Sequence, residues 1–324
     1  MFENSEYFET ILTYGTLSKA ASVLGISQPA LTNYVKQLEA KAGATLFDRS
    51  TSPIILTEAG KIFYRYMKQT EAVKKNYLNE IADLEHKKSG SLTIGGASST
   101  TACYLSRVTA RFLQKYPDCS VKILDGVVSD IARQALNGEI DFFITPESQR
   151  NTEFEYISLL DERLFMCVPE TMVCRLSEQD AQTAKELREK AIPIDDFTNG
   201  KLAGKMYMPV DPGIFKDSRF ILLEDGTNVR EISNKLFAAW GYSPVNPVVV
   251  SQMLTGFHLS VSNAGISFLP ESILKYGRFK DYPVIYALDE SISHRRMYAC
   301  CKKSKYMSVL CSEFIEMLKQ TLMQ

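Results

Sequence analysis

The chain lacks the features of membrane-spanning and exported proteins. No apolar run approaches the roughly 18 residues that a membrane span needs, and residues 1–6 are acidic where a signal peptide would be basic and then apolar. With 37 basic and 38 acidic residues the net charge is −1, so no chain-wide basic surface exists for nucleic acid. We therefore expect a cytoplasmic protein with no membrane partner, in which any DNA binding is local.

The chain also lacks the cysteine and histidine spacings that are typical of metal and redox sites. The 7 cysteines include no Cys-x-x-Cys pair, and the 3 histidines (His86, His258 and His294) are isolated. We expect no metal site and no cofactor, with the cysteines serving as small apolar residues in a reducing compartment. A redox sensor remains the alternative, for which Cys167 and Cys174 have the most suggestive spacing.

Catalytic motifs are missing as well. The chain has no HExxH, no GxSxG and no phosphate-binding glycine loop, and the pair Gly95-Gly96 alone is a weak signal. A length of 324 residues exceeds what one core usually covers, and a hydrophobic fraction of 45% supports sizeable cores. The composition therefore predicts a folded binding protein of two or more domains rather than an enzyme.

The first 60 residues are predicted to form a small helical module. Phe8, Ile11 and Leu12 recur at helical spacing before Gly15 ends the first helix. A short second helix over residues 18–24 can be capped by Thr16 or Ser18 and ends at Gly25. A third helix starts near residue 28, because Ser27 suits the N-cap and Pro29 the first turn.

The third helix has two distinct faces. Leu31, Val35 and Leu38 form an apolar stripe, while Gln28, Thr32 and Lys36 lie on a polar, basic face. Such a helix after a tight turn is typical of a helix-turn-helix, in which the second helix of the motif enters the major groove. We predict that Gln28 and Thr32 read bases and that Lys36 meets phosphate.

Two short strands, in residues 43–49 and 54–56, are expected to form a wing in which Arg49 contacts phosphate. Residues 1–60 nevertheless carry four basic and six acidic side chains. A net charge of −2 does not itself predict DNA binding, so a module for protein contacts remains open at this point.

Residues 61–90 are predicted to form a long linker helix that Thr57 caps. Its apolar and semi-apolar positions step by 4, 3, 4, 4 and 3 residues, close to a coiled-coil seam: Tyr66, Thr70, Val73, Tyr77, Ile81 and Leu84. The expected partner is a second copy of the chain, and the alternative is packing along the helix's own domain. The boundary is expected at Lys87-Lys88-Ser89-Gly90.

Residues 91–324 alternate predicted strands and helices, which indicates two α/β lobes. We expect lobe 1 to comprise about 91–160 and 271–324, and lobe 2 about 161–270. Separate strands are expected over 154–160 and 163–169, and the final strands, 284–288 and 296–301, are expected to return to lobe 1.

Ligands of open α/β sheets bind beyond the carboxyl ends of the strands. Hydroxyl and amide residues follow several predicted strands and are candidates for a small polar or anionic effector: Ser98, Ser99, Thr100, Ser129, Thr145, Thr227 and Asn228. Each alone is an ordinary capping or loop residue, and Arg230 can equally be a surface charge.

Several segments together resemble the LysR-type transcriptional regulators. The motifs are Gly15-Thr16-Leu17-Ser18-Lys19-Ala20-Ala21, Leu24-Gly25-Ile26-Ser27-Gln28-Pro29-Ala30-Leu31-Thr32, Leu46-Phe47-Asp48-Arg49 and Leu56-Thr57-Glu58-Ala59-Gly60, with Gly138-Glu139-Ile140-Asp141 and Ala264-Gly265-Ile266-Ser267-Phe268-Leu269-Pro270 in the second part. The resemblance covers nearly the whole chain and is weakest over about 171–218.

The resemblance implies an α/β multidomain protein. Its parts are an N-terminal all-α winged helix-turn-helix (1–60), a linker and dimerisation helix (61–90), and a two-lobed effector-binding domain similar to type-2 periplasmic binding proteins (91–324). The implied DNA-binding residues are Ser27, Gln28, Pro29, Thr32, Asn33, Lys36 and Arg49. At the wing tip the family often has Arg or Lys where this chain has Ser52 and Pro53. This difference predicts a weaker contact of the wing tip with the phosphates or minor groove of DNA.

The implied partners are double-stranded DNA with a roughly palindromic operator, a small effector between the lobes, and further copies in a homodimer or homotetramer. A solute-binding or carrier protein is the alternative reading of the second part, but it does not account for residues 1–60.

Overall fold

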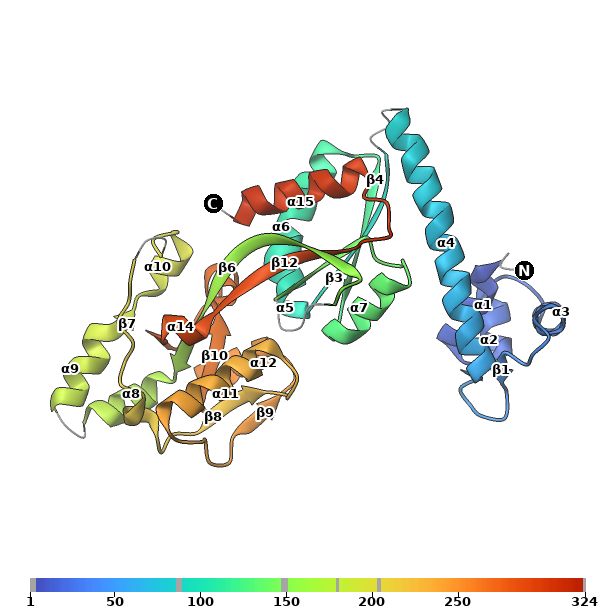
Figure 1. The fold of residues 1–324 in the computed structure, drawn as a ribbon. Helices are drawn as coiled ribbons and strands as arrows, with labels where there is room; N and C mark the ends of the chain where they lie inside the picture. Colours follow the sequence, from blue (N-terminus) through green and yellow to red (C-terminus); the bar gives the residue numbers. More distant parts are fainter. Residues whose placement is uncertain (1–3, 86–88, 147–150, 179–180, 203–204, 323–324) are drawn as a thin grey trace. The chain divides into compact units, whose positions relative to one another are not determined.

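The computed structural model describes residues 4–85, 89–146, 151–178, 181–202 and 205–322. The chain divides into two compact units, residues 1–86 with 136–139 and residues 87–135 with 140–324. The expected boundary residues Lys87 and Lys88 lie outside the described ranges. Each unit is described by itself below (Figure 1).

The first unit begins with the three predicted helices, α1 (Ser5–Tyr14), α2 (Leu17–Val23) and α3 (Gln28–Ala42). The oxygen of Thr16 caps α2 by accepting from the Lys19 N–H, and that of Ser27 caps α3 by accepting from the Ala30 N–H. Gly15 ends α1 with φ 66°, a left-handed conformation that glycine adopts without a Cβ clash. The helix-turn-helix prediction is confirmed.

The wing follows α3. Strands β1 (Phe47–Asp48) and β2 (Ile55–Leu56) pair in antiparallel register. The Ile54 N–H donates to the Gly15 carbonyl over 2.8 Å, which fixes the wing to the turn between α1 and α2.

Helix α4 (Glu58–Leu84) is 27 residues long, and Thr57 caps it by accepting from the Gly60 N–H. Its first turns complete the core of the unit, where Phe63 and Met67 are buried together with Phe8. The helix continues past α1–α3 (Figure 1), so most of its length has no core of its own unit to cover.

The second unit contains the predicted parallel strands of lobe 1. Strand β3 (Gly90–Gly96) pairs in parallel with β4 (Cys119–Asp125) on one side and β5 (Phe142–Pro146) on the other. The covering helices are α5 (Ser98–Thr100), a π-helical turn η1 (Thr101–Leu105), α6 (Ser106–Lys115), α7 (Val128–Leu136) and the closing α15 (Val309–Leu322).

Lobe 2 is a second parallel arrangement. Strand β8 (Phe220–Leu223) lies between β9 (Val248–Val250) and β10 (Ile266–Pro270). The remaining elements are α8 (Glu170–Ser177), α9 (Ala181–Lys190), β7 (Ala191–Ile192), α10 (Ile194–Thr198), the 3-10 turn η2 (Pro212–Phe215), α11 (Asn228–Trp240), α12 (Met253–Val261), α13 (Glu271–Tyr276), β11 (Val284–Ala287) and α14 (Glu290–Ser293). The segment over 171–218 thus adds mainly short helices.

Two long strands join the lobes. Strand β6 (Phe154–Val168) pairs with β12 (His294–Lys302) over its first part and with β10 and β11 over its last part, so one ten-stranded sheet runs through the unit (Figure 1). The expectation of two separate strands here is wrong. Asp161 and Glu162 resemble a turn in the sequence, but Arg296 and Arg295 on β12 pair with them.

The placement of the last strands is corrected in part. Strand β12 pairs with β5 in lobe 1 as expected. Strand β11 instead pairs with the end of β6 and with β7, so residues 284–287 belong to the sheet of lobe 2. Its apolar residues Ile285 and Tyr286 fill cores beside β6, and neither periodicity nor turn residues indicate which lobe holds the free strand edge.

Gly60 provides a test of the packing between α4 and the wing. A Cβ at this position would collide with the backbone carbonyl oxygen of Leu46, which is held by hydrogen bonds and cannot swing aside. We expect Gly60→Ala to lower the free energy of unfolding by about 1–3 kcal/mol, measured by urea denaturation followed by circular dichroism. Gly126→Ala is the control, because nothing lies within 4 Å of its Cβ position; equal stability of the two variants would contradict this account.

Candidate nucleic-acid interface and ligand region

The polar face of α3 forms one continuous surface. Gln28, Pro29, Thr32, Asn33 and Lys36 line a single open depression. The opposite face is buried, with Leu31, Val35 and Leu38 in the core of the unit. The structure therefore brings together five of the seven predicted DNA-binding residues, on a helix whose other side is anchored by apolar packing.

Two hydroxyl groups of the predicted set have partners in the backbone. Ser27 is occupied as the N-cap of α3, with its oxygen 3.3 Å from the Ala30 nitrogen. The Thr32 hydroxyl donates to the Gln28 carbonyl over 2.9 Å. Its proton is thus engaged, which leaves an acceptor lone pair and a methyl group for an outside partner.

Arg49 on the wing has an ion-pair partner on α3. Its guanidinium donates to the Glu39 carboxylate of α3 over 2.5 Å. Sequence reasoning treats Arg49 as a plain phosphate contact and does not pair it with Glu39. No helical or strand periodicity connects residues 39 and 49, so only the folded wing reveals the pair.

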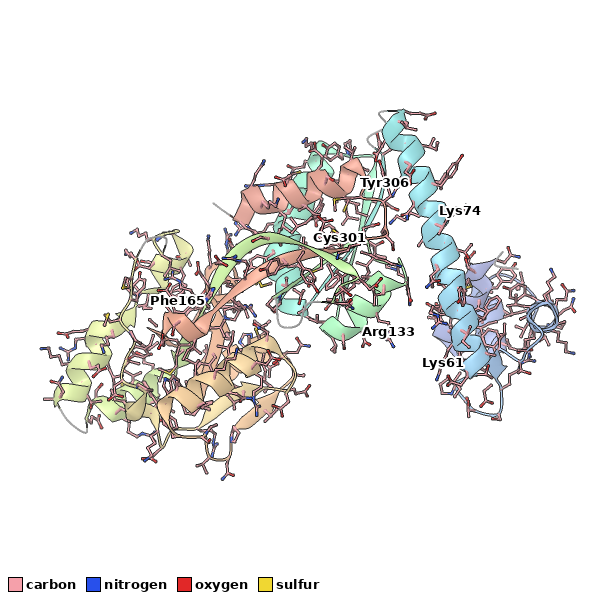
Figure 2. All side chains as sticks on the ribbon, in the orientation of Figure 1. Lys61, Lys74, Arg133, Phe165, Cys301 and Tyr306 are labelled. Atoms are coloured by element: carbon pink, nitrogen blue, oxygen red, sulfur yellow. The ribbon has the colours of Figure 1, made fainter. Side chains whose placement is uncertain are left out.

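The predicted seam of α4 is solvent-exposed in the single chain. Tyr66, Val73, Tyr77 and Leu84 are 52%, 68%, 63% and 76% exposed, and Ile81 is 38% exposed. Lys61 and Lys74 lie along the same helix (Figure 2). A row of large apolar side chains in water is costly unless another surface covers it.

The lobe 1 candidates cluster at the carboxyl ends of β3, β4 and β5. Ser98 and Ser99 are half-buried and Thr100 is buried at the start of the helix after β3, Ser129 is exposed on α7, and Thr145 is buried in β5. The Ser98 hydroxyl donates to the Asp125 carboxylate over 2.8 Å. Asp125, at the end of β4, was missed by the sequence reasoning and brings an acidic group to the candidate region.

The lobe 2 candidates have structural partners. Thr227 is the N-cap of α11 and accepts from the Arg230 N–H. The Arg230 side chain reaches the Leu223 carbonyl at 2.8 Å and the Asn234 amide oxygen at 3.0 Å. Arg230 therefore stabilises the turn between β8 and α11.

Asn228 belongs to a buried polar network at the junction of the lobes. Its amide oxygen accepts from Arg295 at 3.4 Å, and Arg295 donates twice to one oxygen of Glu162, at 2.9 and 2.6 Å. The other Glu162 oxygen accepts from the Tyr104 hydroxyl at 2.7 Å and from the Ser272 N–H at 3.0 Å. The network ties β6 and β12 to η1, α11 and α13.

The charge state of Glu162 follows from this surrounding. Burial by itself would raise the pKa of the carboxyl, because it penalises the charged form, but Arg295 and the donors on Ser272 and Tyr104 outweigh it and hold the pKa below its ordinary value. Glu162 is therefore ionised in the folded protein and fully hydrogen-bonded.

The suggested cysteine pair is divided between two environments. Cys167 is fully buried in β6, where burial raises the pKa of its thiol, and Cys174 is exposed on α8. A buried thiol with a raised pKa is a poor nucleophile, so this pair gains no support as a sensor. Cys301 lies within the packed side chains of lobe 1 (Figure 2).

Among the described residues, no group of three or more His, Cys, Asp or Glu side chains is arranged to hold a metal ion. Within the same ranges, no helix is both long and apolar enough to cross a membrane.

Two family models match the chain. The model described as "Bacterial regulatory helix-turn-helix protein, lysR family" matches residues 2–61. The model described as "LysR substrate binding domain" matches residues 85–193 and 198–323. Together they cover well over half of the chain.

Similar proteins agree with these models. An uncharacterized HTH-type transcriptional regulator, YcgK of Bacillus subtilis, is 26% identical over 98% of this chain and 94% of its own length. The HTH-type regulator YtlI of the same organism is 32% identical over 56% of this chain and 58% of its own length. Among solved structures, full-length CbnR complexed with its target DNA has a TM-score of 0.68 at 18% identity, over 99% of both chains.

The Glu162 network gives a prediction about stability. We expect Glu162→Gln to lower the free energy of unfolding by about 3–5 kcal/mol, because it leaves the buried Arg295 charge unpaired. Asp161→Asn is the matched control: it removes the neighbouring pair with Arg296, which is about half exposed, and should cost at most about 1 kcal/mol. Urea denaturation measures both, and equal losses would contradict the assignment.

The same comparison has a pH dependence. The pKa of Glu162 is lower in the folded chain than its ordinary value of 4.5 in the unfolded chain. The contribution of Glu162 to the free energy of unfolding is therefore complete above pH 4.5 and is lost as the pH falls through the pKa of the folded state. The stability difference between wild type and Glu162→Gln should therefore shrink only under acidic conditions.

Proposed function

The chain belongs to the LysR family of bacterial DNA-binding transcriptional regulators, and we propose that it binds its operator through α3 and responds to a small polar effector between the two lobes. The observation that carries the proposal is the open surface on α3, where Gln28, Thr32, Asn33 and Lys36 face outward from a buried apolar stripe. A helix of this kind suits the major groove, which displays a distinct donor and acceptor pattern for each base pair.

The residues divide by role. Gln28 and Asn33 carry amides that both donate and accept, as base edges require. Thr32 contributes its methyl group and a free lone pair, since its proton is held by the Gln28 carbonyl. Lys36 supplies a charge for phosphate, which adds affinity without reading sequence.

The exposed stripe of α4 supports a homodimer. Pairing α4 with the same helix of a second copy would cover Tyr66, Val73 and Tyr77 and would present two copies of α3 to a roughly palindromic operator. A homotetramer would need a further surface in addition to this helix.

The effector region favours a ligand with hydrogen-bond donors. The effector-binding domain of QuiR, solved in complex with shikimate, has a TM-score of 0.53 to this chain at 18% identity. In our proposal Ser99 and Thr100 bind hydroxyl or carboxylate oxygens, while Ser98 and Asp125, joined by their hydrogen bond, accept from a hydroxyl or amino group. Thr145, Ser129, Thr227 and Asn228 would line the remaining strand ends.

The response follows from linkage between the effector and the operator. A ligand that prefers one arrangement of the lobes and subunits changes operator occupancy or DNA bending by its differential affinity for that arrangement. Because the protein acts on DNA, we also infer that it works in the bacterial cytoplasm.

Footprinting on the DNA upstream of the protein's own coding region and its neighbour tests the division of roles on α3. Lys36→Ala should weaken binding to all sequences alike and reduce the salt slope by about 0.9, because one phosphate contact is lost. Gln28→Ala or Thr32→Val should instead relax selectivity by about 1–3 kcal/mol at a single base position.

The outcomes separate clearly. A protected, roughly palindromic site that is lost in Lys36→Ala supports the proposal. Equal losses on all sequences for the Gln28, Thr32 and Lys36 variants would contradict the roles, and no protection at any salt concentration would contradict the interface itself.

The α4 stripe is tested by Tyr77→Glu, which places a charge in the proposed seam. We expect a monomer at concentrations where the wild type is dimeric, measured by sedimentation velocity, together with weaker protection of both half-sites. Lys61→Glu, at an exposed position on nearly the opposite side of α4, introduces the same group and should leave the dimer intact. A dimeric Tyr77→Glu protein would exclude this seam.

A further inference from the structure

Glu39 makes three hydrogen bonds from one side chain. One carboxylate oxygen accepts from the Leu46 N–H at 2.8 Å and the Phe47 N–H at 3.2 Å. The other oxygen accepts from the Arg49 guanidinium at 2.5 Å. The side chain is only 14% exposed, whereas that of Arg49 is 35% exposed. A residue of α3 therefore holds the beginning of the wing at three points.

The same stretch of backbone is held from the opposite side by α4. Thr57, the N-cap of α4, donates its backbone N–H to the Leu46 carbonyl at 3.1 Å and its hydroxyl to the Thr45 carbonyl at 2.7 Å. The Leu46 side chain is itself buried. Residues 45–47 are thus fixed between α3 and α4, and Glu39 makes the link to α3.

The charges of the pair compensate each other. A hydrogen bond between a guanidinium and a carboxylate is charge-assisted and stronger than one between neutral groups. For Arg49 to neutralise a DNA phosphate as an independent cation, it would have to give up its bond to Glu39 or share it. The wing tip beyond it, residues 50–53, is Ser-Thr-Ser-Pro and supplies no other cation.

We propose that Glu39 is a positioning residue for operator binding. It sets the wing against the recognition helix and keeps the Arg49 charge compensated, so that Arg49 contributes to DNA binding by placing the wing and not by neutralising a phosphate. The proposal rests on the proposed interface of α3, where Lys36 lines the open face.

The proposal is tested by the salt dependence of operator binding, because the slope counts neutralised phosphates and a merely structural contact does not change it. The variants of the full chain are Arg49→Ala, Glu39→Gln and the double variant. Glu39→Gln keeps a carbonyl oxygen for the Leu46 and Phe47 N–H groups but removes the charge. Glu6→Gln is the charge-matched control, since this exposed side chain lies on α1 and not on α3 or the wing.

We expect Arg49→Ala to weaken binding about tenfold on all sequences with an unchanged salt slope. Glu39→Gln should steepen the slope by about 0.9, because the released Arg49 charge becomes available to a phosphate. The double variant should return to the wild-type slope, and Glu6→Gln should stay at it.

The opposite pattern overturns the proposal. If Arg49→Ala lowers the slope by about 0.9 while Glu39→Gln leaves it unchanged, Arg49 is an ordinary phosphate ligand and Glu39 only a structural support. Unfolding curves of each variant serve as the control that the domain remains folded. The Lys36→Ala variant, measured on the same DNA, reports separately on the α3 interface, so a failure of that interface is distinguishable from a failure of the Glu39 assignment.

Discussion

The burial of one face of α3 is the constraint on which the first unit depends. Leu31, Val35 and Leu38 must pack against α1, α2 and α4, and this packing fixes the rotation of the helix about its own axis. Because an α-helix repeats every 3.6 residues, fixing the apolar stripe also fixes the direction of Gln28, Thr32 and Lys36. The direction of the polar face is thus set by apolar packing on the opposite side of the same helix.

The second unit depends on a different feature, a buried ion pair on the strand that is common to both lobes. Strand β6 passes from lobe 1 to lobe 2 through Asp161 and Glu162, and β12 supplies the arginines that pair with them. A buried ion pair is weak evidence for stability by itself, but removing one partner is costly. Tyr104 donates to Glu162 and Asn228 accepts from Arg295, so elements of both lobes meet at one ion pair.

The candidate sites were predictable to different degrees. The face of α3 was predictable because its residues are neighbours on one helix, and helical spacing can be read from the chain. Glu39 with Arg49 and Ser98 with Asp125 were not, because each pair joins two elements separated by a turn or a crossover. The assignment of 284–287 to lobe 1 was wrong for the same reason. Strand β11 pairs where β6 leaves a strand edge open, and the spacing of residues in the sequence does not indicate that edge.

The sequence alone determined the kinds of element and much of their order: three short helices and a wing, one long helix with an apolar stripe, and two α/β lobes. These follow from periodicity, capping residues and turn residues, which act over a few positions of the chain. Tertiary structure alone decided the pairings across it, namely the wing held by Glu39, the single strand β6 with Glu162 at its centre, and the acidic group beside Ser98. Such contacts depend on which surfaces meet after folding, and that is a property of the packed chain as a whole.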